Sequence, residues 1–191
     1  MCWSAEGSLA TYIVGMILSI ISKFYFTTTP MVWLLGTEFT QMQLIEYFLW
    51  KNLNNPVQNE FWSKAGAGLI YIQPLITIWG IQNIKVRSAL WALYGSVTLL
   101  RMLTSKINFS TEVAKNGHLR WNWMSFHKPY TYFWLLMFLG SIYLSKHYKT
   151  FWVSLFTVLM SGYFNFKYDS VGSYWCWIVV FVWLGGILYS K

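Results

Sequence analysis

Seven stretches of mostly hydrophobic residues follow one another along the chain, separated by short polar segments. They cover residues 9–22, 31–50, 65–84, 88–104, 129–145, 150–166 and 172–190. A helix rises about 1.5 Å per residue, so about 20 residues cross a hydrocarbon layer roughly 30 Å thick. The pattern predicts an all-α, polytopic transmembrane helix bundle of seven spans, in a single domain over residues 1–191. Six spans is the alternative, in which one of the shorter segments lies flat in the membrane interface.

The second stretch, residues 31–50, differs from the others because two carboxylates interrupt it. Glu38 and Glu46 are eight residues apart, which on a helix places them about 80° apart around the axis. Gln41 and Gln43 lie at the two edges of the face that the acids share. An ionisable side chain at membrane depth costs about 2.5 kcal/mol or more and normally faces a protein interior or a water-filled cavity. We therefore expect this helix to face inward.

Polar side chains also recur in the third, fourth and sixth stretches. In the third, Gln73 precedes Pro74. A proline inside a helix frees the carbonyl one turn back, so we expect a kink there, with Gln73 satisfying groups that the kink exposes. In the fourth, a polar stripe at helical spacing includes Arg101, and in the sixth another stripe ends at Asn165. We expect the polar groups of the second, third and fourth helices to meet in the core. There, Glu38 and Glu46 either serve an ion pathway or, as the structural alternative, one or both are tied to Arg101 or Gln73 in a polar pair that orients the helices.

The composition is that of a membrane protein. Hydrophobic residues make up 56% of the chain and aromatic residues 21%, whereas only 10% are charged, against about 25% in soluble domains. The net charge of +8 comes from Lys and Arg scattered mostly at segment ends, where they meet anionic lipid headgroups. This distribution favours membrane flanks over a nucleic-acid site. Cys2 and Cys176 lie at opposite ends of the chain without metal-binding spacing, and no sequence feature supports a disulfide between them.

The longest polar segment, residues 106–128, is basic and aromatic. It carries two of the three histidines, nine residues apart, a spacing that matches no standard zinc pattern. We therefore predict no metal site there. We predict lipid or partner contact for the following side chains of this segment: His118, Arg120, Trp121, Trp123 and His127.

Three segments of the first half carry motifs that are met elsewhere: MCWSAEGSLA at the N-terminus, QMQLIEYFLWKNLNN and LIYIQPLITIWGIQN. Through them the chain resembles a group of small, uncharacterised multi-spanning membrane proteins found in giant DNA viruses, some protists and bacteria. The resemblance implies no activity. A viral origin would favour a virion or host-membrane component, by association only. The positions that the group shares with this chain are Cys2, Trp3, Glu6, Glu46, Gln73 and Asn83.

The sequence favours transport over catalysis. It contains no nucleophile motif and no phosphate-binding loop, so we predict no catalytic residue and no cofactor. The leading hypothesis is a multi-pass integral membrane protein, in a membrane that the sequence does not identify, which passes a small cation or solute through a polar core. The residues predicted to form that pathway are Glu38, Gln41, Glu46, Gln73, Asn83 and Arg101.

Two alternatives stay open. The first is a non-catalytic membrane scaffold, in which the polar stripes hold the helices together. The second is a membrane-embedded lipid-modifying enzyme, which would need His118 and His127 to converge with Glu38 or Glu46 around a metal. The predicted partners are membrane lipids and the transported cation or solute. A homo-oligomer is left open, and nucleic acid is not expected.

Overall fold

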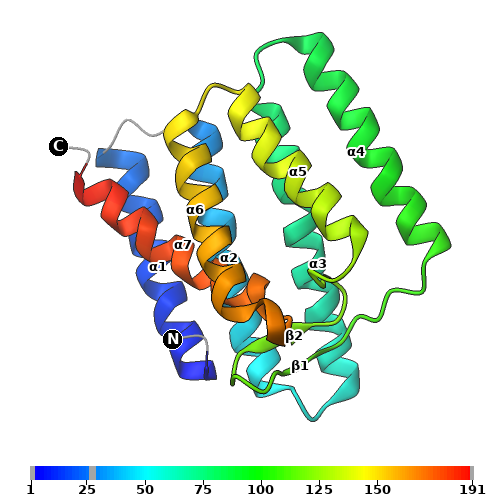
Figure 1. The fold of residues 1–191 in the computed structure, drawn as a ribbon. Coiled ribbons are helices and arrows are strands. Elements are labelled where there is room, and N and C mark those ends of the chain that lie inside the picture. The colour runs from blue at the N-terminus through cyan, green and yellow to red at the C-terminus, as the bar shows by residue number, and fades with distance from the viewer. Residues whose placement is uncertain (1–2, 26–28, 190–191) are drawn as a thin grey trace.

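A computed structural model describes residues 3–25 and 29–189, with side chains up to residue 182. Within these ranges the chain forms seven helices that run alternately up and down, with the hairpin between the fourth and fifth (Figure 1). Cys2, a position named by the resemblance, lies outside the described residues. The elements are α1 (Ala5–Tyr25), α2 (Pro30–Lys51), α3 (Pro56–Trp79), α4 (Ile84–Thr104), β1 (Thr111–Val113), β2 (Leu119–Trp121), α5 (Pro129–Leu144), α6 (Tyr148–Asn165), the 3-10 turn η1 (Phe166–Tyr168) and α7 (Val171–Tyr189).

Prolines and asparagines set the helix starts. Pro30, Pro56 and Pro129 each occupy the first turn of a helix, where the missing N–H has no helical partner to lose. The Asn55 side chain accepts a hydrogen bond from the backbone N–H of Gln58 at 3.2 Å and so caps α3. This cap corrects one sequence boundary, because α3 begins nine residues before position 65 and the expected polar connector is mostly helix.

Helix α2 lies at the centre of the bundle, in contact with α1, α3 and α7. Its buried side chains include Phe39, Met42 and Leu49. Phe39 meets an aromatic cluster from two other helices, with ring centroids 6.3 Å from Phe138 of α5 and 5.3 Å from Trp175 of α7. The expectation that the second helix faces inward is confirmed by this position.

Helix α6 is hydrophobic on its outer face and polar on its inner face. Its exposed stripe consists of Trp152, Phe156, Leu159 and Tyr163. These positions follow the helical spacing i, i+4, i+7, i+11 and so share one side of the helix. The buried side carries Thr157, Ser161 and Asn165.

Helix α1 repeats the arrangement. It exposes Ile13, Ile17, Ile20 and Phe24, again at i, i+4, i+7 and i+11. It buries Ser8, Thr11, Ser19 and Ser22 together with small or apolar residues. A surface helix in water presents the opposite pattern, with its apolar stripe toward the core.

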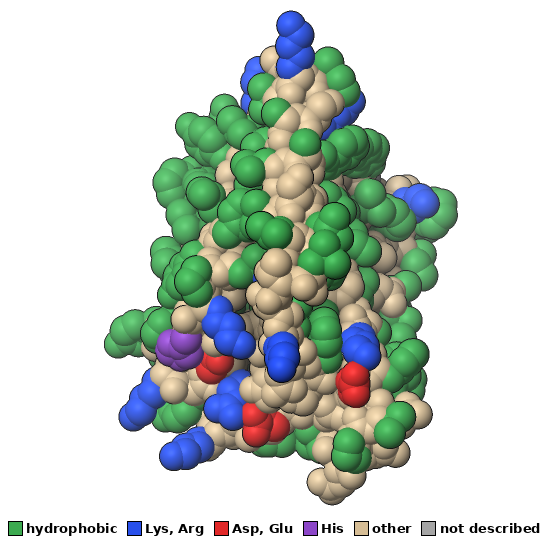
Figure 2. Space-filling view, turned by 90° about the vertical axis from the view of Figure 1, so that its right-hand side faces the viewer, with side chains coloured by type: hydrophobic (Ala, Val, Ile, Leu, Met, Phe, Trp, Pro, Cys, Tyr) green, Lys and Arg blue, Asp and Glu red, His purple; other side chains and the backbone are tan. Residues whose placement is uncertain are grey.

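Charged side chains gather at the two ends of the bundle, and the face seen in Figure 2 is mostly hydrophobic between them. We call the end that holds the β1–β2 turn the hairpin end. Four of the six acidic residues lie there: Glu6, Glu60, Glu112 and Asp169. At the opposite end the described residues include no acidic side chain. The basic residues described at that end are Lys23, Lys85, Arg87, Lys146 and Lys149.

The all-α class and the seven helices are confirmed for the described residues. Judged by length and hydropathy alone, α1 is the described helix that is long and apolar enough to cross a membrane, with a mean hydropathy of 1.5. A shorter apolar stretch, Val171–Val182, lies in α7. That all seven helices span a membrane therefore stays a prediction.

Candidate functional site

Both acids of α2 are buried in the interior. The exposed fraction is 6% for Glu38 and 0% for Glu46. Between them on the same side lies Met42, which is also fully buried. The face of α2 that the sequence identified as polar therefore points into the protein.

Glu38 is hydrogen-bonded to the third helix. The Gln73 amide Nε2 donates to Glu38 Oε2 at 2.5 Å, and Gln73 is itself fully buried. Among the described residues, the second carboxylate oxygen of Glu38 and the amide oxygen of Gln73 have no hydrogen-bond partner. We call these two side chains the Glu38/Gln73 pair. It leaves two oxygen acceptors in the interior that a proton donor or a small cation can occupy.

The carbonyl that Pro74 frees is taken by a different residue from the one expected. Pro74 has no N–H for the Ile70 carbonyl one turn back, and Trp134 Nε1 of α5 donates to that carbonyl at 2.8 Å. Gln73 was expected to satisfy groups exposed by the kink, but its amide N–H bonds to Glu38, the pairing that the sequence left open as the structural alternative. Trp134 thereby leaves Gln73 available to the acid.

A close approach of α1 and α2 adds hydroxyl groups near the same level of the bundle. A Cβ added at Gly15 would lie 2.6 Å from Thr40 Oγ1, so only glycine permits this packing distance. One turn nearer the opposite end, the hydroxyls of Ser19 and Thr37 are 2.6 Å apart. Small residues at helix contacts and hydroxyl bonds across them are typical of helix packing in membranes.

Helix α7 brings a thiol toward the acids. Cys176 is buried, within electrostatic range of the Glu46 and Glu38 carboxyl groups. It is a free cysteine. Helices α3 and α7 therefore both approach the acid-bearing face of α2.

Three other residues of the predicted pathway, Gln41, Asn83 and Arg101, bond to groups other than the Glu38/Gln73 pair. Gln41 is partly buried, and its amide contacts Met16 Sδ of α1 at 3.1 Å. Asn83 is an exposed residue at the opposite end that caps α4 by accepting from the backbone N–H of Lys85 at 3.0 Å. The prediction that Asn83 lines the core is therefore wrong.

Arg101 does not reach either acid. Its guanidinium donates to the Tyr71 hydroxyl at 2.9 Å and to the Trp123 carbonyl at 2.8 Å, and stacks 3.9 Å from the centre of the Tyr130 ring. Together with the hydrogen bond from Tyr94 to the Tyr71 carbonyl, these contacts attach α4 to the outside of α3 and α5 (Figure 1). The expectation that Arg101 tunes the acids is corrected to a packing role.

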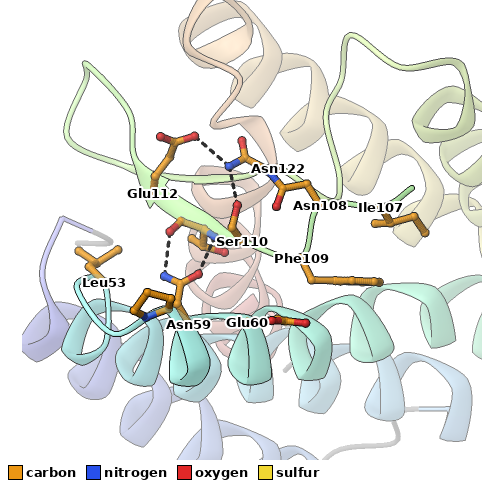
Figure 3. A pocket seen from close by; sticks show the side chains of 11 residues that line it. Leu53, Asn59, Glu60, Ile107, Asn108, Phe109, Ser110, Glu112 and Asn122 are labelled. Atoms are coloured by element: carbon orange, nitrogen blue, oxygen red, sulfur yellow. Dashed lines mark hydrogen bonds between the residues drawn. The ribbon is translucent and has the colours of Figure 1, made fainter. Parts of the chain in front are cut away.

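The hairpin end holds a second polar region, a pocket of about 510 Å³ between the start of α3 and residues 107–112 (Figure 3). Asn59 of α3 forms its base. The Asn59 side chain accepts from the Thr111 backbone N–H at 2.8 Å and donates to the Thr111 carbonyl at 2.9 Å. It therefore pairs with β1 as a neighbouring strand would.

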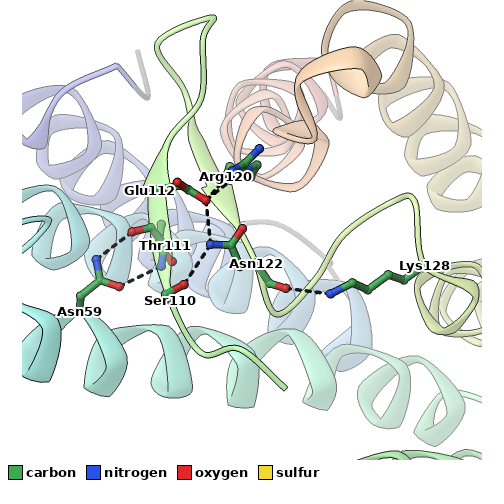
Figure 4. Close-up of polar contacts among 7 residues, drawn as sticks. All are labelled: Asn59, Ser110, Thr111, Glu112, Arg120, Asn122 and Lys128. Atoms are coloured by element: carbon green, nitrogen blue, oxygen red, sulfur yellow. Dashed lines mark hydrogen bonds and ion pairs between the residues drawn. The ribbon is translucent and has the colours of Figure 1, made fainter. Parts of the chain in front are cut away.

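The remaining polar groups of this region bond to one another (Figure 4). Asn122 donates to both Ser110 and Glu112 at 2.9 Å, and Arg120 forms an ion pair of 2.5 Å with Glu112. The hydrogen bonds donated by Arg120 and then Asn122 lower the pKa of the Glu112 carboxyl from its ordinary value. Lys128 Nζ donates to the Asn122 carbonyl at 3.2 Å. The set that we call the hairpin network consists of Asn59, Ser110, Thr111, Glu112, Arg120, Asn122 and Lys128.

Part of the predicted contact surface in the 106–128 segment is buried. The Trp121 and Trp123 rings stack with centroids 5.1 Å apart and are at most 3% exposed. A Cβ on Gly172 of α7 would come within 2.6 Å of the Trp121 ring, so the tryptophans dock the hairpin on α7. The prediction that Trp121 and Trp123 contact lipid or a partner is therefore wrong.

The two histidines of the segment pack against different aromatic rings. His118 is buried between aromatic rings, 4.8 Å from Trp3 and 5.2 Å from Tyr174, so its predicted outward contact is also wrong. His127 is exposed and lies 4.6 Å from the Phe166 ring. In the described part of the chain, no group of three or more His, Cys, Asp or Glu side chains is placed to hold a metal ion. Outward contact stays a prediction for His127 and Arg120.

No protein-family model, curated protein or solved structure matches the chain. The resemblance to the multi-spanning proteins of giant viruses, protists and bacteria therefore stays a prediction.

Sequence reasoning missed two residues near the acids. Trp134 was not singled out, although a proline inside a hydrophobic segment signals a carbonyl that needs a donor. With thirteen tryptophans in the chain, only the packing of α3 against α5 shows which one supplies it. Cys176 was considered only for disulfide or metal chemistry.

Proposed function

We propose that the chain is a multi-pass membrane protein. The support is the reversed polarity of α1 and α6, whose outer stripes are hydrophobic while their inner faces carry hydroxyl and amide groups. Lipid is the surrounding in which this arrangement is stable, because exposed Ile and Phe cost nothing there and buried polar groups hold helices together. The charged ends and the hydrophobic band of Figure 2 support the same placement.

The modest hydropathy of α2 and α3 is consistent with this proposal. Their polar residues, such as Glu46, Gln73 and Asn59, lie inside the bundle. Polar side chains lower the mean hydropathy of a helix wherever they point. A helix with a polar inner face can therefore be exposed to lipid and still have a low mean hydropathy.

Within this protein, the function that the geometry favours is passage of a proton or another small cation through the interior. The observation that carries it is the Glu38/Gln73 pair, in which a buried carboxylate keeps an oxygen without a partner among the described residues. Intramembrane carboxylates that face a bundle interior characteristically serve ion pathways and proton relays. Glu46, two helical turns nearer the hairpin end, supplies a second acid on the same helix.

The test is ion flux into liposomes that contain the purified protein and a pH-sensitive dye, under an imposed potential. We expect flux above that of protein-free liposomes, and Glu38→Gln should reduce it to the protein-free level because the amide can neither exchange a proton nor attract a cation. Glu60→Gln is the matched control, since Glu60 is an exposed acid paired with Lys64. Wild-type flux equal to that of empty liposomes, or full flux in Glu38→Gln, contradicts the proposal.

A scaffold is the second candidate, and helix α4 is the observation that favours it. Among its described side chains only Tyr94 is buried, and its exposed residues include Leu99, Leu100 and Leu103. Such a helix can pack against another membrane protein. A protein without flux that still co-purifies with a defined partner through α4 would support this candidate.

The lipid-modifying enzyme is not proposed, because among the described residues no group of three or more His, Cys, Asp or Glu side chains is placed to hold the metal that it needs.

A further inference from the structure

A groove enters the bundle from the opposite end, between α2 on one side and α6 and α7 on the other. Its volume is about 210 Å³. Leu35 and Phe39 of α2, Phe138 of α5 and Val179 of α7 form its hydrophobic walls. From Val32 to Phe39 the groove follows eight residues of α2, roughly 10 Å of helix length.

One charged residue lies at the mouth of the groove. Lys149 is the second residue of α6 and is exposed. The described part of this end carries no acidic side chain that could neutralise its charge. A second cation, Lys146, lies three residues earlier in the chain. The site therefore combines a hydrophobic slot with a cation at its entrance.

The size of the slot limits what can occupy it. A helix with its side chains is about 10–12 Å across, which is too wide for a groove of about 210 Å³. A single unbranched hydrocarbon chain is narrow enough, and the walls offer it a nearly continuous hydrophobic surface. The exposed ammonium favours a molecule whose head is anionic, because the opposite charges attract.

We propose that this groove binds one anionic phospholipid, with an acyl chain between α2 and α6 and its phosphate against Lys149. The proposal rests on the membrane placement argued above but not on ion passage. A failure to bind the lipid would therefore contradict this proposal alone, and an absence of ion flux would contradict the proposed function alone.

The test is native mass spectrometry of the protein released from detergent micelles with either phosphatidylglycerol or phosphatidylcholine added. The wild type should retain one phosphatidylglycerol at least tenfold better than phosphatidylcholine. Lys149→Gln should remove this preference, because its amide keeps the length of the side chain without the charge. Lys106→Gln, an exposed cation at the hairpin end, is the control and should retain the wild-type preference.

Filling the groove tests the acyl chain separately. Ser154→Phe places a ring inside the slot and should abolish retention of both lipids, and Thr150→Phe does the same at the mouth if the first variant does not fold. Wild-type retention in the folded filling variants overturns the proposal. An unchanged preference in Lys149→Gln, or an equal loss in Lys106→Gln, also overturns it, because binding would then depend on diffuse charge.

Discussion

The Glu38/Gln73 pair and the hairpin network are both polar, but they differ in how completely their groups are paired. In the hairpin network Asn59 satisfies both backbone groups of Thr111, and Asn122 donates to two acceptors. In the interior, Glu38 and Gln73 share one hydrogen bond and each keeps an oxygen without a described partner. A closed network stabilises a structure, whereas buried acceptors that stay open reduce stability unless a ligand occupies them. This difference indicates a structural role for the hairpin end and is the basis for proposing ion passage through the interior.

The largest expected effect is at Glu38, where one substitution should remove ion flux without lowering thermal stability. Glu38→Gln should abolish ion flux while its midpoint of thermal unfolding stays the same or rises, because a neutral amide is less costly to bury than a carboxylate and can still accept from Gln73. Circular dichroism melting in detergent, beside the flux assay, measures both. A large fall in the melting midpoint would make Glu38 a structural residue and remove the contrast.

Asn59→Ala should act in the opposite way, lowering stability by about 2–4 kcal/mol, because it leaves the buried N–H and carbonyl of Thr111 unpaired. Chemical unfolding in mixed micelles gives the free energy. Asn108→Ala, an exposed neighbour in the same pocket, is the control and should change little. If the two substitutions have equal effects, the hairpin network is not what stabilises this end.

Trp134→Phe should lower the free energy of unfolding by about 1–2 kcal/mol, because the Ile70 carbonyl loses its donor. The double variant with Pro74→Ala sharpens this prediction. Alanine restores an N–H at position 74, so Trp134→Phe should cost less in that background than in the wild type. Additive effects in the double-mutant cycle would show that the hydrogen bond does not compensate for the proline.

The smallest expected effect is the contribution of Glu112 to the pH dependence of the free energy of unfolding. Its folded-state pKa is lowered, so the stabilisation is present above the unfolded pKa, about 4.3, and is lost as the pH falls through the folded pKa. Because Glu112 and Arg120 are about half exposed, we expect only a few tenths of a kcal/mol. Unfolding at pH 6 and pH 3 should show this difference in the wild type, and Glu112→Gln should remove it.

The pattern of hydrophobic residues was sufficient to predict the helices, because helical periodicity and turn residues are local properties of the chain. It also predicted that Glu38 and Glu46 face inward, since the cost of exposing a carboxylate to lipid depends on the side chain and its depth alone. Helix α3 was the exception. Five of its first nine residues are polar, and the cap at Asn55 that starts it was not recognised.

Pairings between distant residues could not be predicted in the same way. Trp134 meets the Ile70 carbonyl and Arg101 meets Tyr71, and neither pairing was predicted. Gln73 meets Glu38, which was one of two pairings for the acids that the sequence left open. The burial of Trp121 and Trp123 likewise depends on Gly172, about fifty residues further along the chain.

The sequence by itself determined the seven helices, the inward face of α2 and the charged ends, because periodicity, turn chemistry and solvation act on each segment separately. Only the tertiary structure decided which polar groups are paired, which acid keeps an open oxygen and where a groove remains. These outcomes depend on how helices rotate and approach one another, and that is set by the packing of the whole bundle.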